Sequence, residues 1–283
     1  MAYGRRSSNI MDKPLSISSV VTPYLSDNNY KFLDAQTIYV LSIANGSLAN
    51  YDESSATAPM GAPSLVVPTE QTLTIAYNKS MLLRIQQTQI QDIPISSFSK
   101  TVALQQIDQV FIPAHDAYSL AKIFAARPAG NIVQRNTSRN DFGLKTMIDK
   151  IRTNGGDMAQ IVCWVTFTLA SEIADKINYT GSDAGYVQGR NGYLGKIGGI
   201  NAVEVPDSYL FAGVHALAAD KRAVINVAPK MDPKQGGMKV LEDVPLFSGI
   251  EIQLRDRADT FVLSKKVNAV ASLETTASTT TTT

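Results

Sequence analysis

The residues that could carry out chemistry are few and scattered along this 283-residue chain. It contains two histidines, His115 and His215, and one cysteine, Cys163. A tetrahedral zinc site drawn from these three would still need carboxylates, and one cysteine cannot form an intrachain disulfide. Cys163 lies in an apolar run that is typical of a buried strand, where cysteine is usually structural. We predict no catalytic residue, no metal site and no cofactor-binding residue.

His115 and Asp116 are the one adjacent pair of a histidine and a carboxylate. Neighbours on a helix point in different directions, so we expect no oriented acid–base pair, and a catalytic triad needs three converging groups. His215 lies in the apolar run 214–219 and is interpreted as a packed or surface histidine. The tryptophan Trp164 is interpreted as a core residue.

A dense cluster of charges lies near the C-terminus. We interpret it as a solvated or intersubunit ion-pair network, because strand alternation places Glu251 and Arg255 on the polar face. The cluster consists of Glu251, Arg255, Asp256, Arg257 and Asp259.

Seven of the eighteen glycines fall within 181–199. A phosphate-binding glycine loop follows a strand and precedes a helix N-terminus, whose amides hold the anion. Here the glycines precede residues 200–205, an apolar strand-like run that ends at Pro206. The spacing also lacks a G-x-G-x-x-G pattern. The run therefore predicts a turned loop that leads into a strand.

Composition narrows the function classes further. The chain is 44% hydrophobic, with 26 basic and 25 acidic residues and a net charge of +1. A dedicated nucleic-acid binder usually shows a basic excess, because phosphate neutralisation supplies much of its affinity. No signal-peptide core and no membrane-spanning run is evident, so we expect a cytoplasm-like compartment.

The first third of the chain reads as an arm, a long loop and strands. Residues 1–30 show few periodic apolar positions and predict an arm, and 37–43 predict a strand. Residues 47–68 predict a long loop. Two alternating runs, 73–77 and 81–85, flank Asn78-Lys79, which predicts a hairpin turn at that dipeptide.

The remainder mixes helices and strands. A helix is predicted over 99–126, with a kink or a break at Pro113, because an interior proline removes a helical hydrogen bond. A second helix over 144–151 should stop at Asn154-Gly155-Gly156, followed by a strand over 160–165 and a third helix over 169–177 that Thr168 caps. Strands are predicted over 250–254 and 261–263. The order indicates an α+β fold, ending in a low-complexity threonine tail.

This order of elements resembles the major capsid proteins of tailed bacteriophages, which share the Hong Kong 97 fold. The resemblance covers most of the chain and lies in the arm, the extended loop before the strand runs and a helix similar to the family's spine helix. That helix contains Ala114-His115-Asp116-Ala117-Tyr118-Ser119-Leu120. The glycine-spaced passage 192–210 and the closing 247–255 and 258–263 are similar to later strands of the family.

The resemblance implies a domain plan. It places an N-terminal arm at 1–35 and an extended loop and hairpin at 36–90. A peripheral domain with the spine helix spans 91–160, an axial domain spans 161–240, and strands that return to the peripheral domain span 241–274. The threonine tail is 275–283.

The resemblance also implies a structural function without enzymatic activity. The chain would assemble through pentamers and hexamers into an icosahedral head around double-stranded DNA, after synthesis in the host cytoplasm. Its partners would be copies of itself, a scaffolding protein, a portal, a decoration protein and weakly contacted DNA, with no membrane. An encapsulin-like nanocompartment shell is the alternative, and a cytosolic α+β enzyme with the glycine loop as a lid is a remote one.

Two departures from the family pattern matter. Pro113 interrupts the spine region, which puts the straightness of that helix in question. The loop 47–68 contains no lysine for the covalent crosslink found in some members, although Lys79 lies just beyond it. We therefore expect an uncrosslinked shell. The short arm leaves no room for a fused scaffolding segment, so we expect a separate scaffolding protein.

Overall fold

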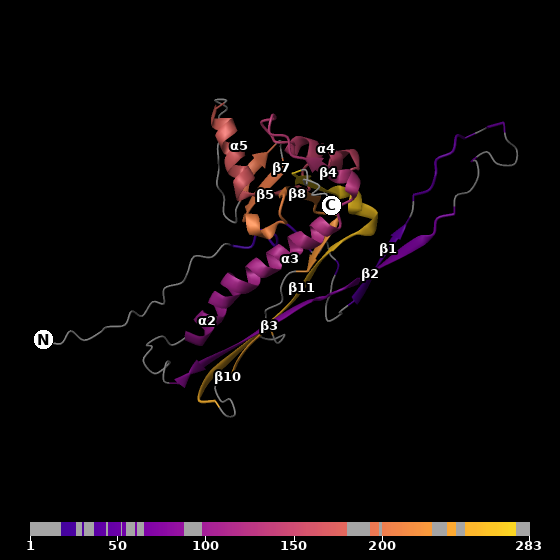
Figure 1. Ribbon diagram of the computed structural model, residues 1–283. Helices are drawn as coiled ribbons and strands as arrows, with labels where there is room; N and C mark the ends of the chain where they lie inside the picture. The colour runs from indigo at the N-terminus through magenta and orange to yellow at the C-terminus, as the bar shows by residue number, and fades with distance from the viewer. Residues whose placement is uncertain are drawn as a thin grey trace, which may run out of the picture. The chain divides into compact units, whose positions relative to one another are not determined.

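The computed structural model describes residues 18–26, 30, 37–43, 45–51, 53–54, 60, 65–87, 98–179, 193–197, 200–227, 237–241 and 247–275. The chain divides into two compact units, and Figure 1 shows their elements. One unit is Phe32–Thr74, and the other combines Met1–Lys31 with Ile75–Thr283.

The smaller unit is a two-stranded antiparallel sheet. Strand β1 spans Thr37–Ile43, as predicted, and β2 spans Pro68–Thr74. Thr37 lies opposite Thr74, and Ile43 lies opposite Pro68. The long loop between these strands is therefore the connection of one hairpin. It is not a separate segment that precedes one.

The predicted hairpin turn at Asn78-Lys79 is wrong. Both residues lie inside β3, Tyr77–Gln86, which pairs with β11, Gly249–Val262, and Lys79 faces Asp256 across the ladder. The alternation of apolar residues has the same phase in a continuous strand as in two strands joined by a short turn. Period alone could not separate the two cases. The break falls instead before β3, where the amide of Ala76 donates to Asp259 Oδ2 at 2.7 Å.

The larger unit contains a six-stranded mixed sheet. Its β5–β7 and β4–β12 pairs are parallel, and its other pairs are antiparallel. The spatial order is β4 (Ile132–Gln134), β12 (Val270–Glu274), β8 (Val214–Asp220), β5 (Ile161–Thr166), β7 (Ile200–Val205) and β6 (Tyr193–Ile197). The predicted strands over 160–165 and 200–205 are confirmed within one residue.

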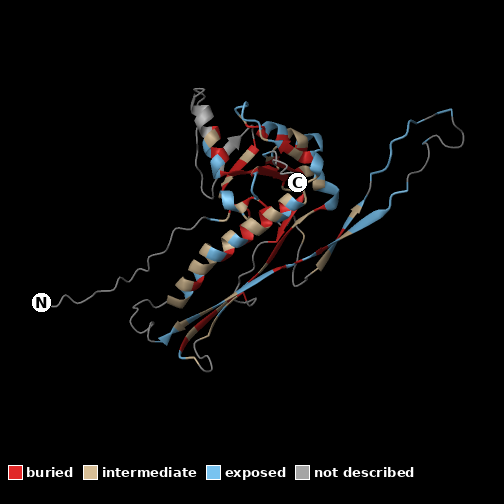
Figure 2. Cartoon of the chain, in the orientation of Figure 1, coloured by how far each residue is buried: buried red, intermediate tan, exposed pale blue. Residues whose placement is uncertain are grey.

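Helices cover both faces of this sheet. The side chains of β5 alternate between two clusters, with Cys163 and Val165 in one and Val162 and Trp164 in the other. The first cluster packs under α4, Leu144–Thr153, and α5, Phe167–Tyr179. The second packs under the long helix. Strand β5 is buried on both faces, as Figure 2 shows for the middle of the sheet.

The boundaries of α4 follow the prediction. Its buried residues are the four of the predicted apolar stripe, Leu144, Met147, Ile148 and Ile151. At its end the amide of Gly155 donates to Arg152 O and that of Gly156 donates to Ile151 O. Gly155 has φ +89°, the left-handed conformation that this helix stop requires.

The start of α5 differs from the prediction. Thr166, not Thr168, caps the helix, because its Oγ1 accepts from the amide of Leu169 at 3.3 Å. The amide and hydroxyl of Thr168 instead donate to Asp207 in the short 3-10 helix Asp207–Tyr209. Thr166 therefore supplies the local cap, and a carboxylate from a distant segment binds Thr168.

The long helix runs through Pro113 without a break, so the predicted kink or break is wrong, although the winding changes just before the proline. It runs as α2, Phe98–Gln106, a π-helical turn, Ile107–Phe111, and α3, Ile112–Ala125. The amide of Ile112 donates to Ile107 O, five residues back. Pro113 has no amide hydrogen and lies in the first turn of α3, where none is needed. The π turn comes directly before the turn that contains the proline, and the helix continues in one direction (Figure 1).

The first half of this helix covers a second sheet. The sheet order is β10 (Met238–Leu241), β11 and β3, and β9 (Val224–Val227) pairs with the far end of β11. Ile252 and Leu254 of β11 pack with Ala103 and Phe111 of the helix. The sequence predicted two strands here, but β11 is one strand of 14 residues, because positions 255–258 continue the ladder with β3 and 259–262 pair with β9.

Part of the predicted arm belongs to the core. Val20 and Val21 are fully buried and pack with Leu120, Ile123 and Trp164 between the six-stranded sheet and α3. The expectation that this segment lies outside the core is wrong for the described residues 18–26. No helix in the described part of the chain is both long and apolar enough to cross a bilayer.

Candidate functional site

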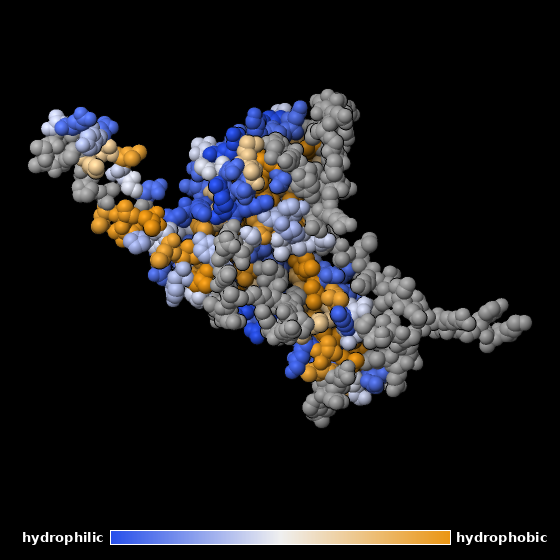
Figure 3. Space-filling view, turned by 180° about the vertical axis from the view of Figure 1, so that it is seen from behind, coloured by the Kyte–Doolittle hydropathy of each residue, from blue (hydrophilic) through white to orange (hydrophobic). Residues whose placement is uncertain are grey.

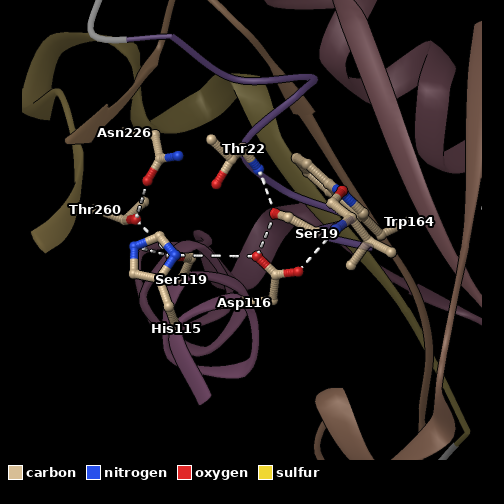
Figure 4. Close-up of polar contacts among 9 residues, drawn as sticks. Ser19, Thr22, His115, Asp116, Ser119, Trp164, Asn226 and Thr260 are labelled. Carbon is tan, nitrogen blue, oxygen red and sulfur yellow. Dashed lines mark hydrogen bonds and ion pairs between the residues drawn. The ribbon is translucent and has the colours of Figure 1, made fainter. Parts of the chain in front are cut away.

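A buried polar network fixes the N-terminal segment to α3 (Figure 4). Asp116 accepts hydrogen bonds from Ser19 Oγ at 2.8 Å and from the amide of Val20 at 2.7 Å. Trp164 Nε1 donates to the carbonyl of Val20 at 2.9 Å, and the amide of Thr22 donates to Ser19 Oγ. Two carboxylate bonds and one indole bond therefore hold a stretch that has no regular secondary structure.

His115 and Asp116 come closer together than their adjacent positions on the helix suggested. His115 Nδ1 lies 3.9 Å from Asp116 Oδ1, and both side chains are buried. Burial lowers the pKa of His115 to about 4. Burial also raises the pKa of Asp116 to about 6, although its hydrogen bonds to Val20 and Ser19 oppose that rise. At neutral pH the imidazole is neutral beside an ionised, hydrogen-bonded carboxylate.

Ser119 completes a serine, histidine and aspartate grouping that does not form a nucleophilic triad. Ser119 Oγ lies 3.5 Å from His115 Nε2, beyond the 2.6 to 3.2 Å reach of an activated nucleophile. Its hydroxyl already accepts from Thr260 Oγ1 at 2.8 Å, and the residue is fully buried. A substrate cannot reach it, so the network is structural.

The acidic residues of β11 are buried, so the prediction of a solvated network is wrong for them, and an intersubunit network stays a prediction. Asp259 accepts from the amides of Ala76 and Thr260 and from Tyr118 Oη. Glu251 pairs with Arg84 at 2.9 Å, and hydrogen bonds from Gln253 and Arg84 lower its pKa. Glu251 and Arg255 do share one strand face, as alternation predicted. The alternation did not show which of these polar positions are buried.

Asp256 is the exception in this group. It is fully buried, and neither of its carboxylate oxygens has a hydrogen-bond partner among the described residues. Burial raises its pKa to about 6. Lys79 lies opposite it in the ladder but is exposed.

The remaining predicted residues are placed as packing or surface groups. Cys163 is buried, and burial raises the pKa of its thiol to about 12, so it is not a nucleophile at neutral pH. Trp164 is fully buried. His215 is partly buried, contacts Thr275 Oγ1 at 2.5 Å, and has a pKa lowered by burial and Arg135. Most of the glycine run, 181–192 and 198–199, lies outside the described residues.

The smaller unit exposes an apolar stripe along β1. Tyr39, Leu41 and Ile43 alternate along one face of β1 and are 66%, 69% and 69% exposed. Leu65, Val66 and Val67 before β2 are also exposed. Figure 3 shows the hydrophobic surface over these strands. Apolar side chains gathered on one strand face are typical of surfaces that contact other proteins.

Comparisons with known proteins agree with this architecture at the level of the fold. No protein-family model matches the sequence, and no protein of curated function matches it. The capsid structure of the cyanophage P-SCSP1u is similar with a TM-score of 0.70 and 11% identity, over 96% of this chain and 93% of that one. A structure from Microbacterium phage Oxtober96 has a TM-score of 0.68 and 13% identity, over 96% of both chains.

A mature capsid is also among the similar structures. The asymmetric unit of the bacteriophage PhiM1 mature capsid has a TM-score of 0.59 and 11% identity, over 98% of this chain and 91% of that one. Identities this low carry no information on individual residues. The coverage leaves no large part of either chain unmatched. This chain therefore has the Hong Kong 97 fold of tailed-bacteriophage capsid proteins.

Proposed function

We propose that the protein is a major capsid protein that assembles through pentamers and hexamers into an icosahedral head around double-stranded DNA. The observation that carries the proposal is the fold likeness to phage capsid structures over nearly the whole chain. The protein acts by binding without catalytic turnover and resides in the virion after assembly in the host cytoplasm. Its partners are copies of itself, a separate scaffolding protein, a portal and a decoration protein.

The exposed stripe of β1 supports self-association. Three large apolar side chains exposed side by side favour burial in an interface, which gains about 25 cal/mol for each Å² of apolar surface removed from water. In a closed shell with repeated symmetry, one modest contact recurs in every subunit. We propose that a neighbouring subunit covers this stripe. The domain boundaries at 35, 90, 160, 240 and 274 remain part of the proposal.

A matched pair of variants tests the stripe. Tyr39→Thr/Leu41→Thr/Ile43→Thr removes the apolar surface and keeps residues that favour strands. Tyr39→Phe/Leu41→Met/Ile43→Val keeps it apolar. We expect the first variant to melt like the wild type but to form no particles in negative-stain electron microscopy, and the second to assemble. Particles of normal size and yield from the threonine variant would refute the role of the stripe.

The encapsulin-like shell differs from the phage head in content. Particles that hold nucleic acid after nuclease treatment of their exterior would support the phage head. Particles that consistently hold a protein cargo and no nucleic acid would favour the nanocompartment.

A further inference from the structure

A polar hollow on the larger unit brings three cationic side chains together. It has a volume of about 270 Å³ and lies between the end of α4, the turn between β8 and β9, and the 3-10 helix Ser264–Ala269. Arg222, Lys265 and Lys266 line it, with Asp220 as the one acidic residue of the lining. Figure 3 shows a strongly hydrophilic surface over α4 and this 3-10 helix.

The positive charge in the hollow is only partly neutralised. Arg222 binds Asp220 through Nε at 3.0 Å and Nη2 at 2.6 Å, and this contact lowers the pKa of Asp220 against its burial. Lys266 Nζ donates to the carbonyl of Arg222 at 2.9 Å, which leaves its charge uncompensated by that bond. Lys265 is exposed. Asp220 is therefore paired with Arg222, on which Asp157 also acts electrostatically, and neither lysine forms an ion pair among the described residues.

The rest of the lining narrows the class of ligand. Its apolar members are two alanines, Ala223 and Ala269, and it contains no aromatic residue. A peptide segment usually needs a larger apolar or aromatic anchor, and an unpaired base needs an aromatic ring to stack on. These lysines can recognise the repeated charge of a phosphate backbone. That contact requires neither an apolar anchor nor an aromatic ring.

We propose that Lys265 and Lys266 form a surface that contacts the phosphodiester backbone of duplex DNA without reading its sequence. The identification of that DNA with a packaged genome rests on the proposed capsid function, whereas the phosphate contact does not. Because the net charge of the whole chain is only +1, we expect this contact to be weak. Such contacts release counterions, so affinity falls with salt in proportion to the number of phosphates neutralised.

The test is the salt dependence of duplex binding by the full-length protein. Fluorescence anisotropy with a labelled duplex of random sequence gives the slope of log K against log salt. Lys265→Gln should make that slope shallower by about 0.9, and Lys265→Gln/Lys266→Gln by about 1.8. Lys100→Gln/Lys239→Gln removes two exposed lysines elsewhere and should leave the slope unchanged. Thermal melting confirms that each variant folds.

Three results would overturn the proposal. These are no duplex binding by the wild type at 50 mM salt, equal slopes for the hollow and control variants, or Lys265-dependent binding of a poly-glutamate peptide with duplex binding unchanged. The last would assign the hollow to an acidic protein segment. Particle formation is scored separately by electron microscopy. Absent particles in the presence of the scaffolding partner, together with altered slopes, would refute the capsid proposal and leave the phosphate surface intact.

Discussion

Two buried carboxylates, one on α3 and one on β11, hold backbone segments that are distant from them in the sequence. Asp116 holds the N-terminal segment, and Asp259 holds the backbone just before β3. Each accepts backbone amides that would otherwise be buried without a partner, which would cost about 1 to 3 kcal/mol per group. The sequence identified these residues as a helix neighbour of His115 and as members of a charge cluster. It could not show their burial, because that depends on segments far away in the chain.

Ser19 and Val20 were missed altogether at the residue scale. They lie in a polar stretch with few apolar positions, and no periodic signal marks their contact with Asp116 and Trp164. The one sequence feature that pointed to this contact was the pair of adjacent valines, Val20 and Val21. Both are fully buried in the structure. By contrast, the structural roles of Cys163 and Trp164 followed from the surrounding apolar run.

Asp256 should destabilise the subunit at neutral pH. Its pKa is raised to about 6 from an ordinary value of 3.8, so between these values the folded state holds a proton that the unfolded state has lost. The free energy of unfolding therefore falls as pH rises through this window, and the loss persists above pH 6. Asp256→Asn should raise the free energy of unfolding at pH 7.5 by on the order of 2 kcal/mol, and by much less at pH 4.5.

Urea denaturation at the two pH values checks this, with Asp149→Asn as the control. Asp149 is half exposed and pairs with Arg152, so its loss should change stability little at pH 7.5. An Asp256→Asn variant that is less stable than the wild type at pH 7.5 would show that the carboxylate has a partner in solution.

At the scale of elements, the period of the apolar residues identified most helices and strands. It failed where pairing with a distant strand sets the boundaries of an element. The stripe of α4 and its glycine stop are local features, and both were predicted. The misplaced turn at Asn78-Lys79 and the split of β11 concern two strands, β3 and β11, that pair with each other over a separation of more than 160 residues. Pro113 indicated a kink or a break in the long helix. The sequence did not indicate that a π turn before the proline would let the helix continue.

Gly249 in the β3–β11 ladder has no room for a side chain. It has φ +154°, and a Cβ there would lie 2.1 Å from the carbonyl oxygen of Ile85. Gly249→Ala should therefore destabilise the larger unit by on the order of 3 kcal/mol, since backbone and not a flexible side chain must move. Gly130→Ala, where a Cβ would meet nothing within 4 Å, is the control. Equal melting temperatures for the two variants would contradict the ladder as described.

At the scale of the whole molecule, the order of elements carried more information than any single motif. No sequence family matched, and the fold emerged from the arm, the long loop, the spine helix and the closing strands taken together. Interfaces could not be predicted in the same way, because an exposed apolar strand face becomes visible only when the strand's partner and its exposure are known. The charges lining the hollow likewise come from segments far apart in sequence.

The loop of the smaller unit should be needed for assembly and not for folding. Ile43 lies opposite Pro68, so deleting 47–66 leaves Ala44-Asn45-Gly46-Val67 to close the hairpin, with an Asn-Gly pair that favours tight turns. We expect the deletion variant to show the wild-type melting temperature and to remain unassembled. Particles that form in normal yield would show that this loop is not a contact between subunits.

The most direct measurement of the central claim is cryo-electron microscopy of the full-length protein after expression with its own scaffolding partner. The capsid account predicts closed icosahedral particles whose walls contain rings of five and six copies, each with the two sheets and the long helix described above. A protein that remains a compact monomer under every assembly condition tried, with the scaffolding partner present, would contradict it.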